Sequence, residues 1–335
     1  MHLTGLVEHP DHVCCRYRLA ALEPFFAANG HHLRIRSIPR GFWSRLQTWR
    51  SLHEADAVIL QRRLMASWHV RLIRRHARRL IYDFDDAVYQ RDSYAGNSIE
   101  SRSRRRRFIA AMHSADLIVA GNSFLQQEAA RFVAMDRIQV IPTCVDPSQY
   151  LTAHHAEKQR TQLVWIGSAS TVKGLERRRP LFDTVTKFVP NLELKVICDH
   201  FPTFETMPVV PVAWSAATER VELASADIGV SWVPDDLWSK GKCGLKVLQY
   251  MAAGLPVVAN PVGVQSEMVR HGETGFLADT QDEWIDAIRQ LAADPALRQR
   301  MGSAGRRVVE REYSVARAAE LWLGLLSPAS KKAAA

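Results

Sequence analysis

The chain has 335 residues, of which 47% are hydrophobic and 24% are charged, and its formal net charge is +9. This length suits two domains of ordinary size, and this composition excludes an intrinsically disordered chain. The sequence has no apolar run near the ~20 residues of a membrane span, and its first residues meet charge too early for a signal peptide. We therefore expect a cytoplasmic protein.

The cysteines and histidines show no pattern of metal or disulfide chemistry. No CxxC pair occurs, and an odd number of cysteines suits a reducing compartment. The histidine pairs at 31/32 and 154/155 are adjacent, so they are poorly placed to chelate zinc from one face of a regular element. We expect no metal site. The five cysteines are Cys14, Cys15, Cys144, Cys198 and Cys243.

In the first half of the chain, short apolar runs alternate with amphipathic stretches. The runs at 57–61, 80–82, 117–120 and 138–141 indicate buried strands, and Pro142 ends the last of them. The stretches between them, such as 68–79 and 123–132, have helical periodicity. This alternation is typical of βαβ units and a parallel sheet. We predict a first Rossmann-like domain over residues 1–150, followed by a polar linker.

Much of the positive charge lies in this first half. Its arginines form either a solvated helix face or a contact with an anionic membrane surface, an anionic acceptor or nucleic acid. Aromatic residues are not interleaved with them and no nucleic-acid-binding signature occurs, so we expect no nucleic acid partner. Peripheral contact with the inner face of a membrane stays open. These residues are Arg62, Arg63, Arg71, Arg74, Arg75, Arg78, Arg79, Arg102 and Arg104 to Arg107.

The sequence YDFDDA places Asp83, Asp85 and Asp86 at the end of a predicted strand. Clustered carboxylates in such a position need partners, so they indicate a site, a helix cap or ion pairs with nearby arginines. We predict that Asp85 and Asp86 are catalytic or acceptor-binding residues.

Two other loops of the first domain are candidates. Arg16, Tyr17 and Arg18 lie where the chain leaves its first loop, and the two arginines are predicted to bind donor phosphate or an anionic acceptor; a solvated helix start is the alternative. Asn122 and Ser123 form another strand-to-helix loop, in which either can cap the helix that follows.

A second series of alternating elements begins at residue 160. Apolar runs at 163–166, 192–197, 227–231 and 256–259 each end in a small or polar loop. Ligands of open α/β sheets bind beyond the carboxyl ends of the strands. Two such sheets that face one another would leave a cleft suited to a small molecule. We predict a second Rossmann-like domain over residues 160–312.

The first loop of this domain, in WIGSASTVKG, combines small residues with a lysine. Such residues let backbone N–H groups approach an anion, and Lys173 adds charge. Gly167, Ser168 and Lys173 therefore indicate phosphate binding, although small-residue βα loops are common.

The stretch KGKCGLKVLQYMAAG (240–254) carries more information. Gly241 and Gly244 permit a tight turn before a helix, and Gly254 is placed as its C-cap. The amides at the helix start lie at the positive end of the helix dipole, and Lys242 and Lys246 add charge. These features suit a diphosphate site and an ordinary amphipathic helix with solvated lysines about equally.

This stretch resembles the donor-binding region of the retaining GT-B glycosyltransferases of family 4. In that family a Gly-Leu turn opens a helix that ends in Ala-x-Gly-x-Pro-Val-Val, here AAGLPVV, and a Gly-Phe-Leu segment follows, here at 275–277. IPTCVD (141–146) resembles the interdomain signature of the family, and Tyr313 and Ser314 resemble the start of its last helix. The resemblance implies a GT-B fold, with two Rossmann-like domains facing across a cleft and a helix 313–326 that packs back on the first domain.

The resemblance also implies roles for donor-binding residues. Trp214 lies where the family places the nucleotide base, and membership of the core is its alternative. Trp232 and Trp238 flank the donor turn and are expected to wall the sugar pocket. The implied donor-binding residues are Gly167, Ser168, Lys173, Trp214, Lys242, Gly244, Leu245, Lys246 and Gln249.

Three positions depart from the family pattern. The glutamate pair that contacts the donor sugar and the ribose is replaced by Gly241 and Gln249, and the phosphate-binding arginine by Ser168. The Gln249 amide can still bond a ribose hydroxyl, whereas glycine has no side chain. We expect Lys242 or Lys246 to supply the missing charge.

The implied activity is transfer of a sugar, with retention, from a nucleoside diphosphate sugar to a hydroxyl of a glycan, a lipid-linked or a small-molecule acceptor. No metal or other cofactor is expected. The missing glutamates motivate one alternative, a non-catalytic nucleotide-binding or scaffold protein of the same fold. A basic nucleic-acid-binding protein and an epimerase of the same fold are further alternatives, and the donor-turn match argues against the epimerase.

Overall fold

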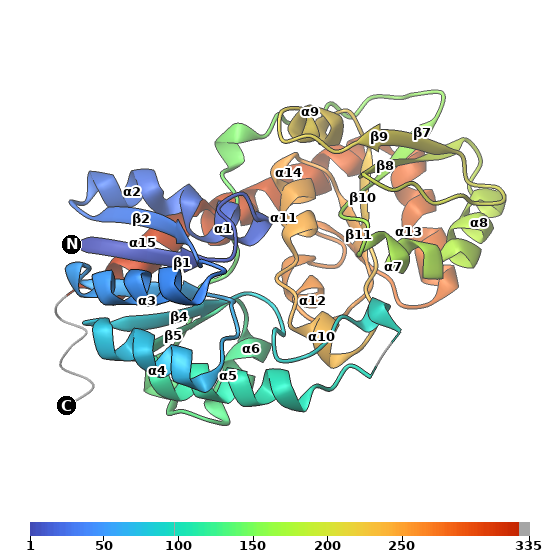
Figure 1. Ribbon diagram of the computed structural model, residues 1–335. Helices are drawn as coiled ribbons and strands as arrows, with labels where there is room; N and C mark the ends of the chain where they lie inside the picture. Colours follow the sequence, from blue (N-terminus) through green and yellow to red (C-terminus); the bar gives the residue numbers. More distant parts are fainter. Residues whose placement is uncertain (97, 328–335) are drawn as a thin grey trace. The chain divides into compact units, whose positions relative to one another are not determined.

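Two six-stranded parallel sheets organise the chain in this computed structural model, which describes residues 1–96 and 98–327 (Figure 1). The chain divides into two compact units. Unit 1 consists of Met1–Cys144, Asp236–Cys243 and the residues from Val315 onward, and unit 2 of Val145–Asp235 and Gly244–Ser314.

The sheet of unit 1 has the strand order β2-β1-β3-β4-β5-β6. The strands β3 to β6 lie where the apolar runs predicted them, and each strand of the sheet pairs in parallel with its neighbours. They are β1 (His2–Val7), β2 (His32–Ser37), β3 (Ala57–Gln61), β4 (Leu80–Phe84), β5 (Leu117–Ala120) and β6 (Ile138–Val140).

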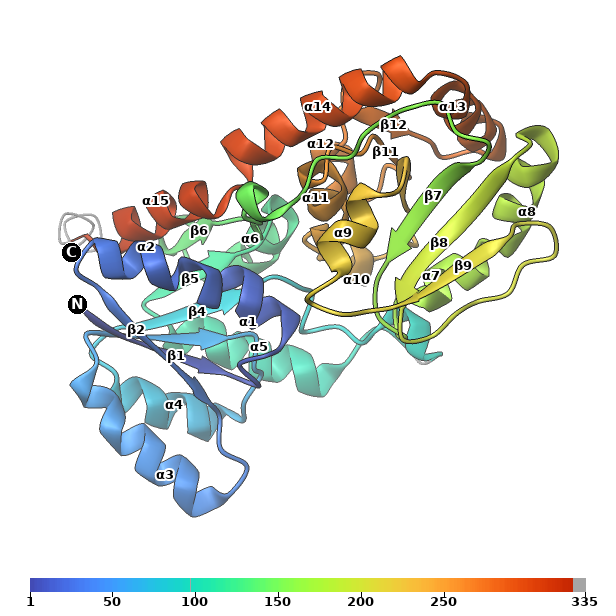
Figure 2. The same cartoon turned by 90° about the horizontal axis from the view of Figure 1, so that it is seen from above.

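Successive side chains of these strands point to opposite faces of the sheet, and a layer of helices covers each face. Val58 and Leu60 belong to the core under α3, α4 and α5, whereas Ala57 and Ile59 belong to the core under α1, α2 and α15 (Figure 2). The helices are α1 (Val13–Arg18), α2 (Glu23–Ala28), α3 (Phe42–Arg50), α4 (Ser67–His76), α5 (Arg102–Ser114), α6 (Ser123–Ala130), α10 (Leu237–Lys240) and α15 (Val315–Leu326).

The sheet of unit 2 has the order β12-β11-β10-β7-β8-β9. Its strands are β7 (Thr161–Ile166), β8 (Leu192–Cys198), β9 (Val209–Ala213), β10 (Ile228–Ser231), β11 (Val257–Ala259) and β12 (Gly275–Leu277). Its helices are α7 (Val172–Arg177), α8 (Arg179–Phe188), α9 (Glu219–Ala224), α11 (Leu245–Ala252), α12 (Gln265–Met268), α13 (Gln281–Ala293) and α14 (Pro295–Glu312).

Tyr250 fixes α11 against this sheet. Its hydroxyl donates to the carbonyl of Val230 (3.2 Å) and accepts from the amide of Ile166 (3.0 Å), so one side chain joins the helix to β10 and β7. Gly229 lets the ring approach, because a Cβ there would lie 2.5 Å from its Cδ2. The start of α11 is thereby held near the carboxyl ends of two central strands.

One short segment lies in a different unit from its neighbours in sequence. The sequence places residues 236–243 within the second domain, but the structure packs Asp236–Cys243, here called the α10 segment, into unit 1. Trp238 is buried and contacts the ring of Tyr94 edge-on at 5.6 Å. Packing in unit 1 thus outweighs proximity in sequence.

Candidate functional site

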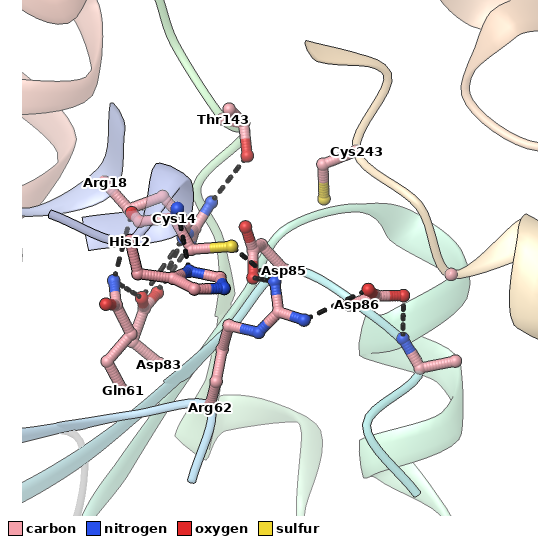
Figure 3. A network of polar contacts seen from close by, with 12 residues as sticks. His12, Cys14, Arg18, Gln61, Arg62, Asp83, Asp85, Asp86, Thr143 and Cys243 are labelled. Carbon is pink, nitrogen blue, oxygen red and sulfur yellow. Dashed lines mark hydrogen bonds and ion pairs between the residues drawn. The ribbon is translucent and has the colours of Figure 1, made fainter. Parts of the chain in front are cut away.

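Polar side chains gather where β3 and β4 of unit 1 end. Asp85 and Asp86 follow β4, and Arg62 follows β3, the strand paired with it through Gln61 and Asp83. Because the strands are parallel, their carboxyl ends meet at one edge of the sheet, and the three side chains point toward one another there (Figure 3).

The Arg62 guanidinium bridges both carboxylates. Its Nη1 lies 3.1 Å from Asp85 Oδ1 and its Nη2 lies 3.1 Å from Asp86 Oδ2, and Nη1 also contacts the sulfur of Cys14. The pairs place one guanidinium between two acidic side chains.

Arg62 adopts a left-handed backbone conformation, with φ of 55°. Such a conformation costs a residue other than glycine about 1 kcal/mol. It is held by the amide of Arg62 donating to the carbonyl of Asp83 (2.7 Å) and by the Tyr82 hydroxyl donating to the carbonyl of Arg62 (3.1 Å). Arg62 was not predicted as a site residue. The feature that could have indicated it is its place directly after a buried strand.

Asp85 is kept ionised by its neighbours. Burial alone would raise the pKa of this carboxyl group, but the charges of Arg62 and Arg18 outweigh it, so the pKa lies below its ordinary value. By contrast, burial and the negative charge of Asp85 raise the pKa of the Cys14 thiol. Asp85 is therefore a permanent negative charge, and Cys14 stays a neutral thiol.

Asp86 is the more accessible of the two carboxylates. Its side chain is 18% exposed, compared with 8% for Asp85. One oxygen accepts from the amide of Ala87 (2.9 Å) and the other faces Arg62. Asp86 is thus the better placed of the two to meet a ligand.

Arg18 lies in the interior of unit 1. Its side chain is 2% exposed and forms a bidentate ion pair with Asp83, which is 0% exposed, with Nη2 at 2.5 Å from Oδ1. Its Nη1 donates to the carbonyl of Ile141 (2.9 Å) and to the Thr143 hydroxyl (3.4 Å). The prediction that Arg18 binds phosphate or acceptor therefore gives way to a structural role: it neutralises Asp83 inside the sheet edge.

Arg16 occupies a different environment. It is half-buried on the short helix α1, with its guanidinium carbon 5.5 Å from the centroid of the Tyr17 ring. Its role in binding phosphate or acceptor stays a prediction.

Asn122 joins the α10 segment to β5 and α6. Its Oδ1 accepts from the amide of Leu125 (2.8 Å), which is the helix cap that the sequence left open. Its Nδ2 faces three successive carbonyls, those of Lys240 (3.5 Å), Gly241 (3.3 Å) and Lys242 (3.1 Å). This buried side chain therefore fixes the path of the α10 segment beside the carboxylates.

Gly241 has a physical reason to be glycine. A Cβ at this position would lie 2.6 Å from Ala87 Cβ and 2.7 Å from Ala87 N. A glutamate at the position where the family carries its first carboxylate thus cannot be built unless the backbone beside Asp86 moves. The backbone at Gly241 thus lies against Ala87, the residue that follows Asp86.

Lys242 and Lys246 belong to different units. Lys242 Nζ lies 3.4 Å from the ring centroid of Trp238 in unit 1, and Lys246 Nζ lies 4.2 Å from the ring centroid of Trp165 in unit 2. Each lysine is thus oriented by a cation–π contact. Trp238 is buried, and its expected place in the wall of a sugar pocket stays a prediction.

In unit 2, the start of α11 forms the predicted turn. Gly244 is the N-cap residue, with φ of 62°, and no side chain caps the helix there. A side chain at Gly244 would meet the sulfur of Met268 at 2.7 Å, so the tight turn also needs glycine sterically. The uncapped helix start and the half-buried Leu245 and Lys246 offer backbone amides and a positive charge to an anion.

The loop after β7 is also exposed. Ser168 and Lys173 are solvent-accessible, and the hydroxyls of Ser168 and Ser170 lie 3.0 Å apart. A Cβ at Gly167 would lie 2.6 Å from the Thr171 hydroxyl oxygen, so glycine permits this compact loop. Within unit 2, the loop follows the strand to which Tyr250 anchors α11.

Trp214 and Gln249 differ in accessibility. Trp214 is 46% exposed after β9, and its Nε1 donates to Glu219 (2.8 Å). Gln249 is 5% exposed on α11. Their donor contacts stay predictions. Within residues 1–96 and 98–327, no group of three or more histidine, cysteine or acidic side chains is arranged to hold a metal ion.

Residues 237–308 match the family model described as "Glycosyl transferases group 1". The chain is 27% identical to D-inositol 3-phosphate glycosyltransferase of Pseudarthrobacter chlorophenolicus and 26% identical to alpha-maltose-1-phosphate synthase of Mycolicibacterium smegmatis. Each alignment runs over 250 residues and covers 63% of the chain. These alignments span 55% and 62% of the two relatives.

Among solved structures, sucrose-phosphate synthase from Thermosynechococcus elongatus aligns with 97% of the chain and 98% of its own length, with a TM-score of 0.70 and 17% identity. HepE of Anabaena in complex with UDP aligns with 97% and 99%, with a TM-score of 0.68 and 14% identity. The resemblance to group 1 glycosyltransferases and the GT-B fold class are thereby confirmed.

Proposed function

We propose that this chain, which shares its fold and residues 237–308 with the group 1 glycosyltransferases, transfers a sugar from a nucleoside diphosphate sugar to a hydroxyl acceptor. We further propose that the anomeric configuration is retained and that no metal takes part. The start of α11 carries the proposal, because an uncapped helix start with a glycine turn and a lysine suits a diphosphate.

The two units would divide the chemistry. In unit 2, the amides at the start of α11 and Lys246 would stabilise negative charge that develops on the departing diphosphate. In unit 1, Asp86 would accept a hydrogen bond, and then the proton, from the acceptor hydroxyl. Asp85 would stay ionised and hold Arg62, since its lowered pKa makes it a poor proton acceptor.

The acceptor is proposed to be a hydroxyl compound, anionic or lipid-linked, met in the cytoplasm at the inner face of a membrane. This proposal is supported by the exposed arginines at the start of α5, which are Arg102 and Arg104 to Arg107. No helix among residues 1–96 and 98–327 is long and apolar enough to cross a bilayer. We propose that the membrane contact is peripheral and made through these arginines.

The test is turnover with a panel of UDP-, GDP- and ADP-sugars, with product nucleotide as readout and the anomeric proton of the product read by NMR. We expect turnover with one nucleotide, an unchanged rate in excess EDTA and a retained anomeric centre. Nucleotide binding without turnover on any donor or acceptor would favour the non-catalytic alternative, which Gly241 and Gln249 motivate.

Lys246→Ala is expected to weaken binding of the nucleoside diphosphate about tenfold or more, because a hydrogen bond to a charged group contributes roughly 1.5–3 kcal/mol. Binding of the nucleoside alone should change much less. Titration calorimetry with both ligands measures the difference, and Lys187→Ala on the solvent face of α8 is the matched control. Equal affinities of Lys246→Ala and wild type for the nucleoside diphosphate would contradict the proposed position of the diphosphate at this turn.

A further inference from the structure

Three aromatic side chains of unit 1 lie exposed and in contact with one another. Trp43 is 79% exposed, Phe42 52% and Trp68 45%. The ring centroid of Phe42 lies 5.3 Å from that of Trp43 and 6.1 Å from that of Trp68, so the cluster joins the start of α3 to the start of α4. Single exposed apolar residues are ordinary, but a contiguous group of large rings marks an interaction surface.

The exposed aromatic faces are set by helix periodicity. On α4, Arg71 and Arg75 follow Trp68 by three and seven positions, so the three share one helix face. The buried Val70 and Ile73 lie on the opposite face. Both arginines are exposed, so this face ends in positive charge.

The first helix of the pair repeats the pattern. On α3, Trp43, Gln47 and Arg50 share the exposed face, and the buried Trp49 lies on the other side. Each helix thus presents a tryptophan near its start and arginine toward its end, on a face that points away from the sheet.

The aromatic cluster rests on a fixed support. The ring of Trp68 stacks on that of His69 at 3.5 Å, and His69 Nε2 lies 3.3 Å from Nη1 of Arg45. Burial and the charge of Arg45 lower the pKa of His69, so the ring beneath Trp68 is neutral at physiological pH. Trp68 is therefore held outward by packing.

The charge of this surface has one sign. No acidic residue occurs in residues 38–53 or 57–82, which include α3 and α4. Arg40, Arg50, Arg71 and Arg75 are all exposed. Positive charge around large aromatic rings matches an anionic lipid surface, where indole rings settle at the headgroup level and arginines meet phosphates.

We propose that the aromatic-arginine surface formed by Phe42, Trp43, Trp68, Arg71 and Arg75 docks unit 1 on an anionic lipid bilayer. The rings enter the headgroup region, and the arginines provide attraction that salt screens. The cluster is gathered in one place with cations around it, whereas single-stranded nucleic acid requires stacking rings spread along a basic groove. None of these five residues is among those proposed to hold the diphosphate or to take the proton of the acceptor.

The test is co-sedimentation of the full chain with vesicles, without any sugar donor. Wild type should sediment with vesicles of equal parts phosphatidylcholine and phosphatidylglycerol, release in high salt, and stay in solution with phosphatidylcholine alone. The double variant Trp43→Ser/Trp68→Ser should bind the anionic vesicles at least tenfold more weakly. Arg71→Gln and Arg75→Gln should each bind the anionic vesicles about fivefold more weakly than wild type.

Phe188→Ser is the matched control, because Phe188 is 59% exposed on α8 of unit 2 and should leave vesicle binding unchanged. Circular dichroism and the melting temperature establish that each variant is folded. Wild type that ignores anionic vesicles, or a double tryptophan variant that binds as wild type does, would overturn the proposal. So would a dimer in light scattering that disappears with Trp43→Ser and competes with vesicles. Vesicle binding needs no turnover, so its failure would remove the membrane contact proposed for the acceptor and leave the proposed sugar transfer standing.

Discussion

Arg18→Ala is expected to lower the free energy of unfolding of unit 1 by about 3–5 kcal/mol. The substitution leaves the carboxylate of Asp83 without its bidentate partner at a position that is 0% exposed. Gln61 Nε2, at 3.3 Å from Asp83, is the neighbour that remains, and one neutral donor cannot replace a guanidinium. Urea titration followed by circular dichroism measures the loss.

The double variant Arg18→Met/Asp83→Leu separates a buried unpaired charge from a lost contact. Replacing both members of a buried ion pair by apolar residues of similar size is often close to neutral. We expect the double variant to be more stable than Arg18→Ala. Equal destabilisation of the two would mean that the ion pair itself, and not the stranded carboxylate, carries the energy.

The strands β3 to β8, β10 and β11 were predictable because a parallel sheet covered on both faces requires near-continuous apolar runs. The residues 57–61 and 117–120 were predicted with the bounds that β3 and β5 have. The region of the acidic cluster was predictable for a related reason, since Asp85 and Asp86 directly follow an apolar run.

The different roles of the charged side chains could not be predicted from the sequence. Arg18 and Arg62 look alike in sequence, and only the fold places one inside the sheet edge and the other between two carboxylates. Arg62 also needs a left-handed backbone, which no residue type other than glycine or asparagine signals.

The position of the α10 segment was beyond sequence reasoning as well. Lys242 and Lys246 are four residues apart and were expected to act together, yet Asn122 and Trp238 hold Lys242 in unit 1. The Asn122 contact joins residues 120 positions apart, and local periodicity carries no information about it. Gly241 was visible as a departure, but its cause, the approach to Ala87, was not.

Asp86→Asn is expected to lower kcat about 10²–10⁴-fold, because an amide keeps the shape of the carboxylate but cannot take the acceptor's proton. The donor KM should stay near the wild-type value, since the residues proposed to hold the diphosphate lie in unit 2. Steady-state rates with saturating acceptor measure both quantities. This prediction rests on the proposed function and on the 18% exposure of the Asp86 side chain.

Asp85→Asn is the matched comparison, because the same chemical change is made one residue away. Asp85 is 8% exposed and its lowered pKa ties it to Arg62, so its loss should lower the melting temperature and kcat together. Asp86 is the more exposed of the two, so its loss should lower kcat with the melting temperature nearly unchanged. If Asp86→Asn turned over at the wild-type rate, Asp86 would have no part in proton transfer. If its melting temperature fell in step with kcat, both carboxylates would serve only to hold Arg62.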